Sequence, residues 1–162
     1  MRPVRLAVLT ALLLATASPA FADATIFIGG TTTPTTRQAR GFAVGFGLLF
    51  LGFEFEYANT SEDLAQRAPN LRTAMGNVLL QTPVAIAGFQ PYFTVGGGGY
   101  REQLDALDVL RETQFGMNTG GGVKISLIGP LRVRVDYRVF TLKGAPLYDV
   151  VHRLYIGANL NF

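Results

Sequence analysis

Cysteine is absent from all 162 residues of the chain. The protein therefore has no disulfide framework, no thiolate metal site and no thiol nucleophile. Long uncharged apolar runs are also missing beyond residue 22, although 49% of the residues are hydrophobic and the mean hydropathy is +0.29. A transmembrane helix needs about 20 mostly apolar residues, so the sequence excludes a helical membrane protein. The apolar residues must instead be dispersed among polar ones.

A large excess of charge of one sign is missing as well. The chain has 14 Lys and Arg against 11 Asp and Glu. Two of the arginines, Arg2 and Arg5, lie in a segment that we expect to be removed, which leaves the rest nearly neutral. This balance gives no basis for nucleic-acid binding. No cofactor is expected either.

The N-terminus has the pattern of a secretory signal peptide. Met1–Arg5 is basic, Leu6–Leu14 is almost wholly apolar, and Ala20–Ala22 supplies a small-x-small cleavage pattern. A membrane anchor is the alternative, but the apolar run is too short to span about 30 Å of hydrocarbon. The sequence therefore predicts a signal peptide over residues 1–22, cleaved after Ala22, and one domain over residues 23–162.

Apolar and polar residues alternate through the remainder of the chain. In the last segment every second residue from Leu154 to Phe162 is apolar, and those between are mostly polar. Successive side chains of a strand point to opposite faces, so this strand meets an apolar medium on one side and a polar one on the other. We expect eight strands, at Ala24–Thr33, Gly41–Leu49, Leu51–Asn59, Leu71–Thr82, Gln90–Arg101, Thr113–Leu127, Leu131–Leu142 and a last one ending at Phe162.

Strands of this kind cross a bilayer only in a closed barrel, where every backbone group is paired. The connections after the third and fifth strands, Thr60–Asn70 and Glu102–Glu112, are longer than those after the second, fourth and sixth, as in barrels with short periplasmic turns and long external loops. The chain is therefore predicted to be all-β, an eight-stranded antiparallel up-and-down transmembrane β-barrel. Helices over Leu64–Leu80 and Leu104–Arg111 stay open as alternatives, although Pro69 interrupts the first.

Charged residues on the polar strand faces are expected to point into the lumen. An eight-stranded barrel is just wide enough for side chains to fill, so these charges must pair with one another. The predicted network favours a filled lumen over the alternative of a cation-lined pore. We expect trapped water and four neutral residues to satisfy the excess cations, namely Tyr92, Tyr155, Asn118 and Asn159. The members of the network are Glu54, Glu56, Lys124, Arg132, Arg134, Asp136, Arg138 and Arg153.

Two glycine runs, Gly96–Gly99 and Gly120–Gly122, suggest a phosphate-binding loop at first sight. Such a loop needs a strand-to-helix context and usually a following Lys-Ser/Thr, and both are missing. We expect these glycines to leave room for inward Arg and Tyr side chains, or to curve the sheet.

His152 is the only histidine and lies close to Asp149. Some outer-membrane barrels hydrolyse lipid A with a His, a Ser and an acid at the outer rim. The position two residues after His152 is Leu154, and the serines of the expected mature chain, Ser61 and Ser126, fall in other segments. We interpret His152 as a rim histidine and predict no catalytic residue.

The signal peptide, the eight-strand layout, the segment Met75–Leu80 and the terminal Leu160-Asn161-Phe162 resemble the family of small outer-membrane β-barrels, which includes the OmpA membrane domain and OmpX. The resemblance covers Asp23 to Phe162. It implies the outer membrane of a Gram-negative bacterium, contact with its lipid and lipopolysaccharide, and an interior network of the glutamates with Arg132, Arg134 and Arg138. It also implies a C-terminal signal for the barrel assembly machinery at Ile156, Ala158, Leu160 and Phe162.

These features together predict a non-enzymatic integral barrel with a structural role in the envelope or a surface-loop interaction with a host or cell-surface ligand. A rim-localised lipid A hydrolase and a narrow channel are the alternatives. A soluble periplasmic barrel with a lipid inside is a further one, and its apolar faces would turn inward. No peptidoglycan-binding domain follows the last strand, so we expect no cell-wall tether.

Overall fold

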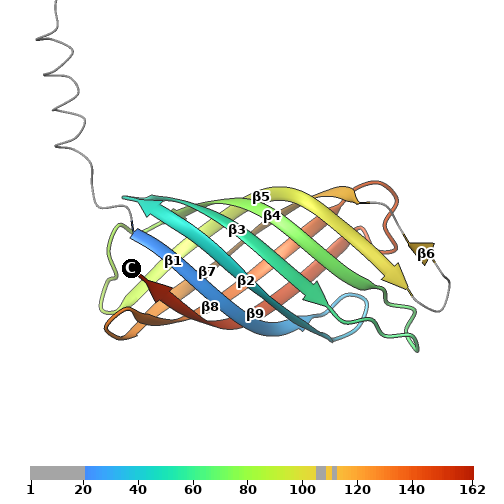
Figure 1. The fold of residues 1–162 in the computed structure, drawn as a ribbon, viewed down its shortest axis with the longest axis horizontal. Coiled ribbons are helices and arrows are strands. Elements are labelled where there is room, and N and C mark those ends of the chain that lie inside the picture. Colours follow the sequence, from blue (N-terminus) through green and yellow to red (C-terminus); the bar gives the residue numbers. More distant parts are fainter. Residues whose placement is uncertain (1–20, 105–108, 111–112) are drawn as a thin grey trace, which may run out of the picture.

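Nine strands make up most of the chain that the computed structural model describes, which comprises residues 21–104, 109–110 and 113–162. Neighbouring strands are antiparallel, and the β4–β5 and β1–β9 pairings close the sheet on itself (Figure 1). Because β6 pairs only with β5, eight strands form the wall, and the predicted eight-stranded antiparallel barrel is confirmed. The strands are β1 (Phe21–Thr31), β2 (Arg37–Leu48), β3 (Leu51–Thr60), β4 (Asn70–Gln81), β5 (Phe89–Leu104), β6 (Val109–Leu110), β7 (Gln114–Ile128), β8 (Leu131–Leu142) and β9 (Val150–Asn161).

β1 begins and β9 ends at the end of the barrel where the short turns lie, so the start of the first strand lies beside the end of the last one (Figure 1). Ala22 N donates to Phe162 O at 2.8 Å, and Phe162 N donates to Ala22 O at 2.9 Å. Cleavage after Ala22 would remove this pair and leave Asp23 opposite Asn161 as the outermost one. Residues 1–20 lie outside the described residues, so the signal peptide stays a prediction.

Strand boundaries differ from the predicted ones mainly at the loop end of the barrel. β2 begins at Arg37 rather than Gly41 because the Arg37 side chain turns inward and is buried. Its guanidinium donates to Thr33 O at 2.8 Å, to Ser61 O at 3.2 Å and also to Pro69 O. The charged residue therefore belongs to the strand and ties two loops to the rim.

Neither alternative helix appears in the described residues. Asp63 and Ala68 form an isolated β-bridge, and β4 follows directly after Pro69. Leu104 pairs with Val109 in the β5–β6 ladder, while residues 105–108 and 111–112 lie outside the described part. Across the described ranges, the chain forms no helix long and apolar enough to cross a membrane.

The apolar face of the strands points outward. Along β2, Phe42, Val44 and Phe46 are exposed, whereas Ala43 between them is fully buried. Large apolar side chains are also exposed on each of the remaining seven wall strands. A continuous exposed apolar surface of this kind marks an interaction with a membrane or a partner. This orientation is the reverse of the one that a soluble barrel with an internal lipid requires. The exposed set includes Ile26, Phe53, Phe55, Phe93, Phe115, Tyr137, Leu154 and Ile156.

Candidate functional site

An ion-pair cluster fills the centre of the lumen. Arg138 Nη2 lies 2.8 Å from Glu54 Oε1, and Arg134 pairs with the other oxygen of the same carboxylate. Asp136, between the two arginines on β8, accepts from Arg134 Nη2 and from Arg138 Nε, each at 2.9 Å. Both arginine side chains are fully buried. Two carboxylates thus neutralise two guanidinium groups at buried positions.

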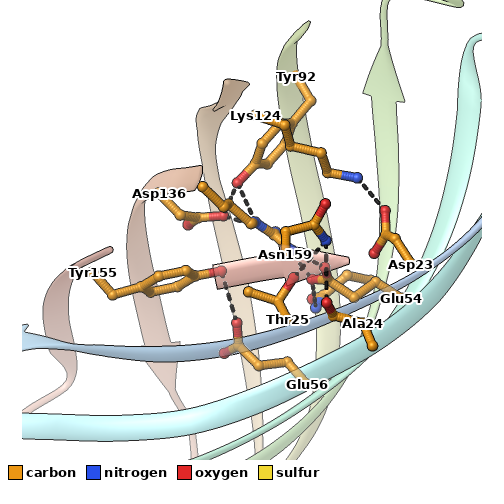
Figure 2. Close-up of polar contacts among 12 residues, drawn as sticks. Asp23, Ala24, Thr25, Glu54, Glu56, Tyr92, Lys124, Asp136, Tyr155 and Asn159 are labelled. Carbon is orange, nitrogen blue, oxygen red and sulfur yellow. Dashed lines mark hydrogen bonds and ion pairs between the residues drawn. The ribbon is translucent and has the colours of Figure 1, made fainter. Parts of the chain in front are cut away.

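Glu56 extends the cluster toward β9. Its Oε2 lies 3.1 Å from Arg138 Nη1, and its Oε1 lies 3.1 Å from Arg153 Nη1. Tyr155 Oη donates to Glu56 at 3.4 Å (Figure 2). The Arg153 guanidinium carbon stacks 4.3 Å from the centroid of the Phe140 ring, a cation–π contact. Arg153 therefore has a single carboxylate partner and an aromatic one.

Neutral side chains satisfy part of the remaining polar groups. Tyr92 Oη donates to Asp136 and accepts from Arg134 Nε at 2.7 Å (Figure 2). Asn118 Nδ2 donates to Asn77 Oδ1 at 2.8 Å, and Asn77 Nδ2 donates to a Glu54 oxygen at 3.3 Å. Asn118 thus reaches the cluster only through Asn77, which the sequence did not single out.

The other two predicted cations lie at the lumen mouth next to the chain ends. Lys124 pairs with Asp23, an acid outside the predicted network, because β1 begins before the predicted Ala24 (Figure 2). Arg132 donates to Gln90 Oε1 at 2.9 Å and to Asn161 Oδ1 at 2.6 Å. Within the described residues it has no carboxylate partner. These five side chains line a cavity of about 420 Å³ that opens at the mouth.

Asn159 is the one predicted partner that lies apart from the charged cluster. Its Nδ2 donates to Thr25 Oγ1 at 2.9 Å and to Ala24 O at 3.4 Å (Figure 2). The Asn159 side chain therefore links β9 to β1, the two strands whose pairing closes the barrel, and it neutralises no charge.

An apolar cluster closes the lumen between the ion pairs and the long loops. Leu71, Met75, Tyr100, Phe140, Leu142 and Val151 are all buried there and pack together. The prediction of a polar interior missed it, because near this end β4 turns Leu71 and Met75 inward while the charged Arg72 points outward. Side chains thus obstruct the lumen at two levels.

Glycines leave the space that the large inward side chains need. A Cβ on Gly122 would lie 2.5 Å from Tyr92 Oη, and one on Gly120 would lie 3.0 Å from Arg138 Cγ. The first distance is shorter than real Cβ contacts, and the second is tighter than most of them. The second glycine run therefore faces the buried tyrosine and arginine, as the predicted role requires.

His152 lies on the outward face of β9. Its Nδ1 and Tyr137 Oη share a hydrogen bond of 2.7 Å, and the two rings stack with centroids 6.1 Å apart. Ser61 Oγ donates to Gln38 O at 3.3 Å, and Ser126 lies near the opposite end of the barrel on β7. In the part of the chain with described positions, no serine bonds to this histidine, and no group of three His, Asp or Glu could hold a metal.

The residues of the predicted assembly signal share the outward face of the last strand. Ile156, Leu160 and Phe162 are exposed there, with Ala158 between them. Recognition of these side chains by an assembly machinery stays a prediction.

A closed eight-stranded antiparallel wall with an apolar exterior and a filled polar interior defines the fold of the small transmembrane β-barrels. The chain is similar to Neisserial surface protein A (TM-score 0.70, 14% identity, 90% of this chain and 98% of that one). It is also similar to the N-terminal β-barrel domain of Pseudomonas aeruginosa OprF (TM-score 0.67, 15% identity, 89% and 100%). The outer membrane enzyme PagL aligns with a TM-score of 0.54 at 10% identity, over 85% and 98% of the two chains. At these identities the likeness shows the fold alone. No family model and no curated protein sequence matches the chain.

Proposed function

We propose that the chain is a non-enzymatic integral protein of a Gram-negative outer membrane, with a structural role in the envelope. The observation that carries this proposal is that apolar side chains cover the outside of the barrel and paired charges lie inside it, the reverse of a water-soluble protein. Phe42, Phe93 and Leu154 are 44%, 54% and 53% exposed, whereas Arg134 and Arg138 are 0% exposed. Burying a charge is costly unless it is paired, while lipid accepts the aromatic exterior without cost.

The filled lumen argues against a channel. Ion pairs of Glu54 and Glu56 with the interior arginines occupy its centre, and the apolar cluster around Phe140 occupies the space toward the loops. Passage of a solute would require both to separate, which would leave buried charges unpaired.

The surroundings of His152 argue against hydrolysis. A catalytic histidine must reach the proton of its nucleophile within hydrogen-bond distance. The partner of His152 is instead the phenol of Tyr137, on the face that we assign to lipid. The Tyr137–His152 pair is typical of side chains at a membrane–water interface, where amphipathic aromatic rings are enriched.

Three loops at this end of the barrel, those after β1, β3 and β8, are held against its rim. Tyr100 Oη donates to Lys143 O at 2.6 Å, and a Glu102 oxygen accepts from Leu147 N at 3.1 Å. Arg37 bonds the two loops that follow β1 and β3. We infer a short, braced external surface, on which a loop interaction with another cell surface would use a small area.

An epitope-insertion experiment tests the proposed location and orientation. An epitope placed between Gln66 and Arg67 should be labelled by antibody on intact cells of a Gram-negative host, and the protein should fractionate with the outer membrane. The matched control carries the same epitope between Ala85 and Ile86, in the turn between β4 and β5, and should be labelled only after permeabilisation. Labelling of both on intact cells, or recovery in the soluble periplasm, contradicts the proposal.

A deletion experiment tests the structural role. Removal of the gene from its host should raise uptake of an antibiotic too large for porins, and the wild-type gene should restore the barrier. A complementing His152→Ala variant should restore it equally. An unchanged barrier in the deletion strain contradicts an envelope role.

A further inference from the structure

Three arginines interrupt the apolar exterior near the long loops. Arg40 on β2, Arg72 on β4 and Arg101 on β5 all have exposed side chains on the outward face. The strand register aligns them, because Arg40 pairs with Asn59, Asn59 with Arg72, and Arg72 with Arg101. They therefore form one row across four neighbouring strands, along the line of cross-strand pairing.

Arg72 and Arg101 lie directly opposite each other on adjacent strands. Like charges in this position destabilise a sheet. Arg101 Nη2 donates to Thr113 Oγ1 at 3.1 Å, a neutral partner, and neither arginine forms an ion pair within the described residues. Glu102, the neighbour of Arg101, turns into the barrel. An anion from outside the chain would relieve the repulsion between the two guanidinium groups.

A hollow of about 240 Å³ lies in the surface at these two arginines. Ala74 and Gly99, a cross-strand pair of small residues, lie two positions from Arg72 and Arg101 toward the middle of the barrel. Tyr57 flanks them on β3. We call this site the basic hollow and define it by six of its lining residues, Tyr57, Arg72, Ala74, Gly99, Arg101 and Thr113.

An apolar hollow follows on the same strands, closer to the middle of the barrel. It measures about 640 Å³, and Phe55, Gly76 and Val95 are among the residues that line it. Phe55 pairs with Gly76 one outward position below the Tyr57–Ala74 pair. The surface thus presents a cationic recess toward the loops and an apolar trough toward the membrane centre, which matches a phosphorylated headgroup above an acyl chain.

We propose that the basic hollow binds a phosphate of a lipid A-type glycolipid in the outer leaflet, clamped between Arg72 and Arg101. This inference rests on the proposed outer-membrane location. Guanidinium groups bind phosphate bidentately, and an arginine on the lipid face costs little only near the interface, where the lipid phosphates also lie. The acyl chain below would cover the trough at Gly76.

Native mass spectrometry of the full chain, expressed in a Gram-negative host and extracted in detergent, tests the proposal. The probes are diphosphoryl lipid A and the same lipid after enzymatic dephosphorylation. Wild-type protein should bind the diphosphoryl form about tenfold more tightly, because dephosphorylation removes charge-assisted hydrogen bonds. If wild-type protein binds the two lipids with equal affinity, the proposal is overturned by this comparison alone.

Variants test the residues. Arg72→Gln with Arg101→Gln should remove the preference for phosphate, and Ala74→Leu should weaken binding by filling the recess while both arginines remain. Arg40→Gln is the control, since it removes one charge from the same row at a position that does not line the hollow. An unchanged preference in the double variant overturns the proposal.

Two further outcomes separate the possible failures. Binding of phosphatidylglycerol as tight as that of diphosphoryl lipid A would show a general attraction for anions and overturn the assignment to lipid A. A wild-type protein recovered as a soluble periplasmic species would overturn the proposed function itself. A folded, detergent-extracted barrel that lacks the phosphate preference would overturn this inference alone.

Discussion

Arg138 Nη2 lies 2.8 Å from Glu54 Oε1, although 84 residues separate the two along the chain. The pair joins β8 to β3, which are not neighbours in the barrel wall. It therefore braces the barrel across the lumen, where the hydrogen-bonded strand ladder provides no connection. Both side chains are buried, so Glu54 and Arg138 depend on ion pairs with each other and with Arg134 and Asp136.

Glu54→Gln should destabilise the barrel strongly. The change leaves the buried Arg134 and Arg138 short of negative charge, and breaking a buried ion pair costs about 3–5 kcal/mol. Urea unfolding of the protein in lipid vesicles measures the loss. Arg132→Gln is the control, because its partners Gln90 and Asn161 are neutral, and it should cost about 1 kcal/mol. Equal losses for the two variants contradict a central role of the ion pairs.

Gly122→Ala should lower the free energy of unfolding by about 1–3 kcal/mol, since overpacking displaces well-packed neighbours. The added Cβ would lie 2.5 Å from Tyr92 Oη and 2.2 Å from Val135 O. In Gly76→Ala the nearest atom is Gly97 O at 3.8 Å on the exterior, so this variant should stay within about 0.5 kcal/mol of wild type. A Gly76→Ala variant that unfolds as readily as Gly122→Ala contradicts the packing argument.

Purified protein in planar bilayers should show no regular conductance steps. The charges at the centre of the lumen are paired, and Met75 and Phe140 pack in the apolar cluster on the loop side. Single-channel recording at both polarities measures this directly. Reproducible steps of one size, absent from detergent-only controls, would show that the lumen opens.

Lipid A from cells that express the protein should have the same mass as lipid A from cells with an empty vector. His152 bonds Tyr137, and no described serine reaches it. Mass spectrometry of extracted lipid A is the measurement, with His152→Ala as the matched variant. Loss of an acyl chain that depends on His152 contradicts a non-enzymatic barrel.

Much of the wall could be predicted from the sequence, because strand side chains alternate with a period of two. β8 runs from Leu131 to Leu142, as the alternation of valine and charged residues indicates. β2 was predicted too short, since Arg37 reads as a loop residue until its inward contacts with Thr33 and Ser61 are known. Alternation of apolar and polar residues identifies the two faces of a strand but does not fix the residue at which the strand begins.

The inward direction of the charged residues followed from the same pattern, whereas their partners did not. The separation of 80 residues between Arg134 and Glu54 is bridged only by the closed register of the barrel. Asp23 was missed as the partner of Lys124 because the predicted first strand began at Ala24, whereas β1 begins at Phe21 and includes Asp23. The position of Arg72 opposite Arg101 likewise depends on register and is not visible in either strand alone.

The hydrogen-bonded wall and its interior ion pairs should resist SDS until the protein is heated. Electrophoresis in SDS of the folded, detergent-extracted protein, with and without prior boiling, measures this resistance. We expect two mobilities, and we expect both bands to come from the outer-membrane fraction. A single mobility from a soluble periplasmic fraction would show that the protein is not a closed barrel with a lipid-facing apolar exterior.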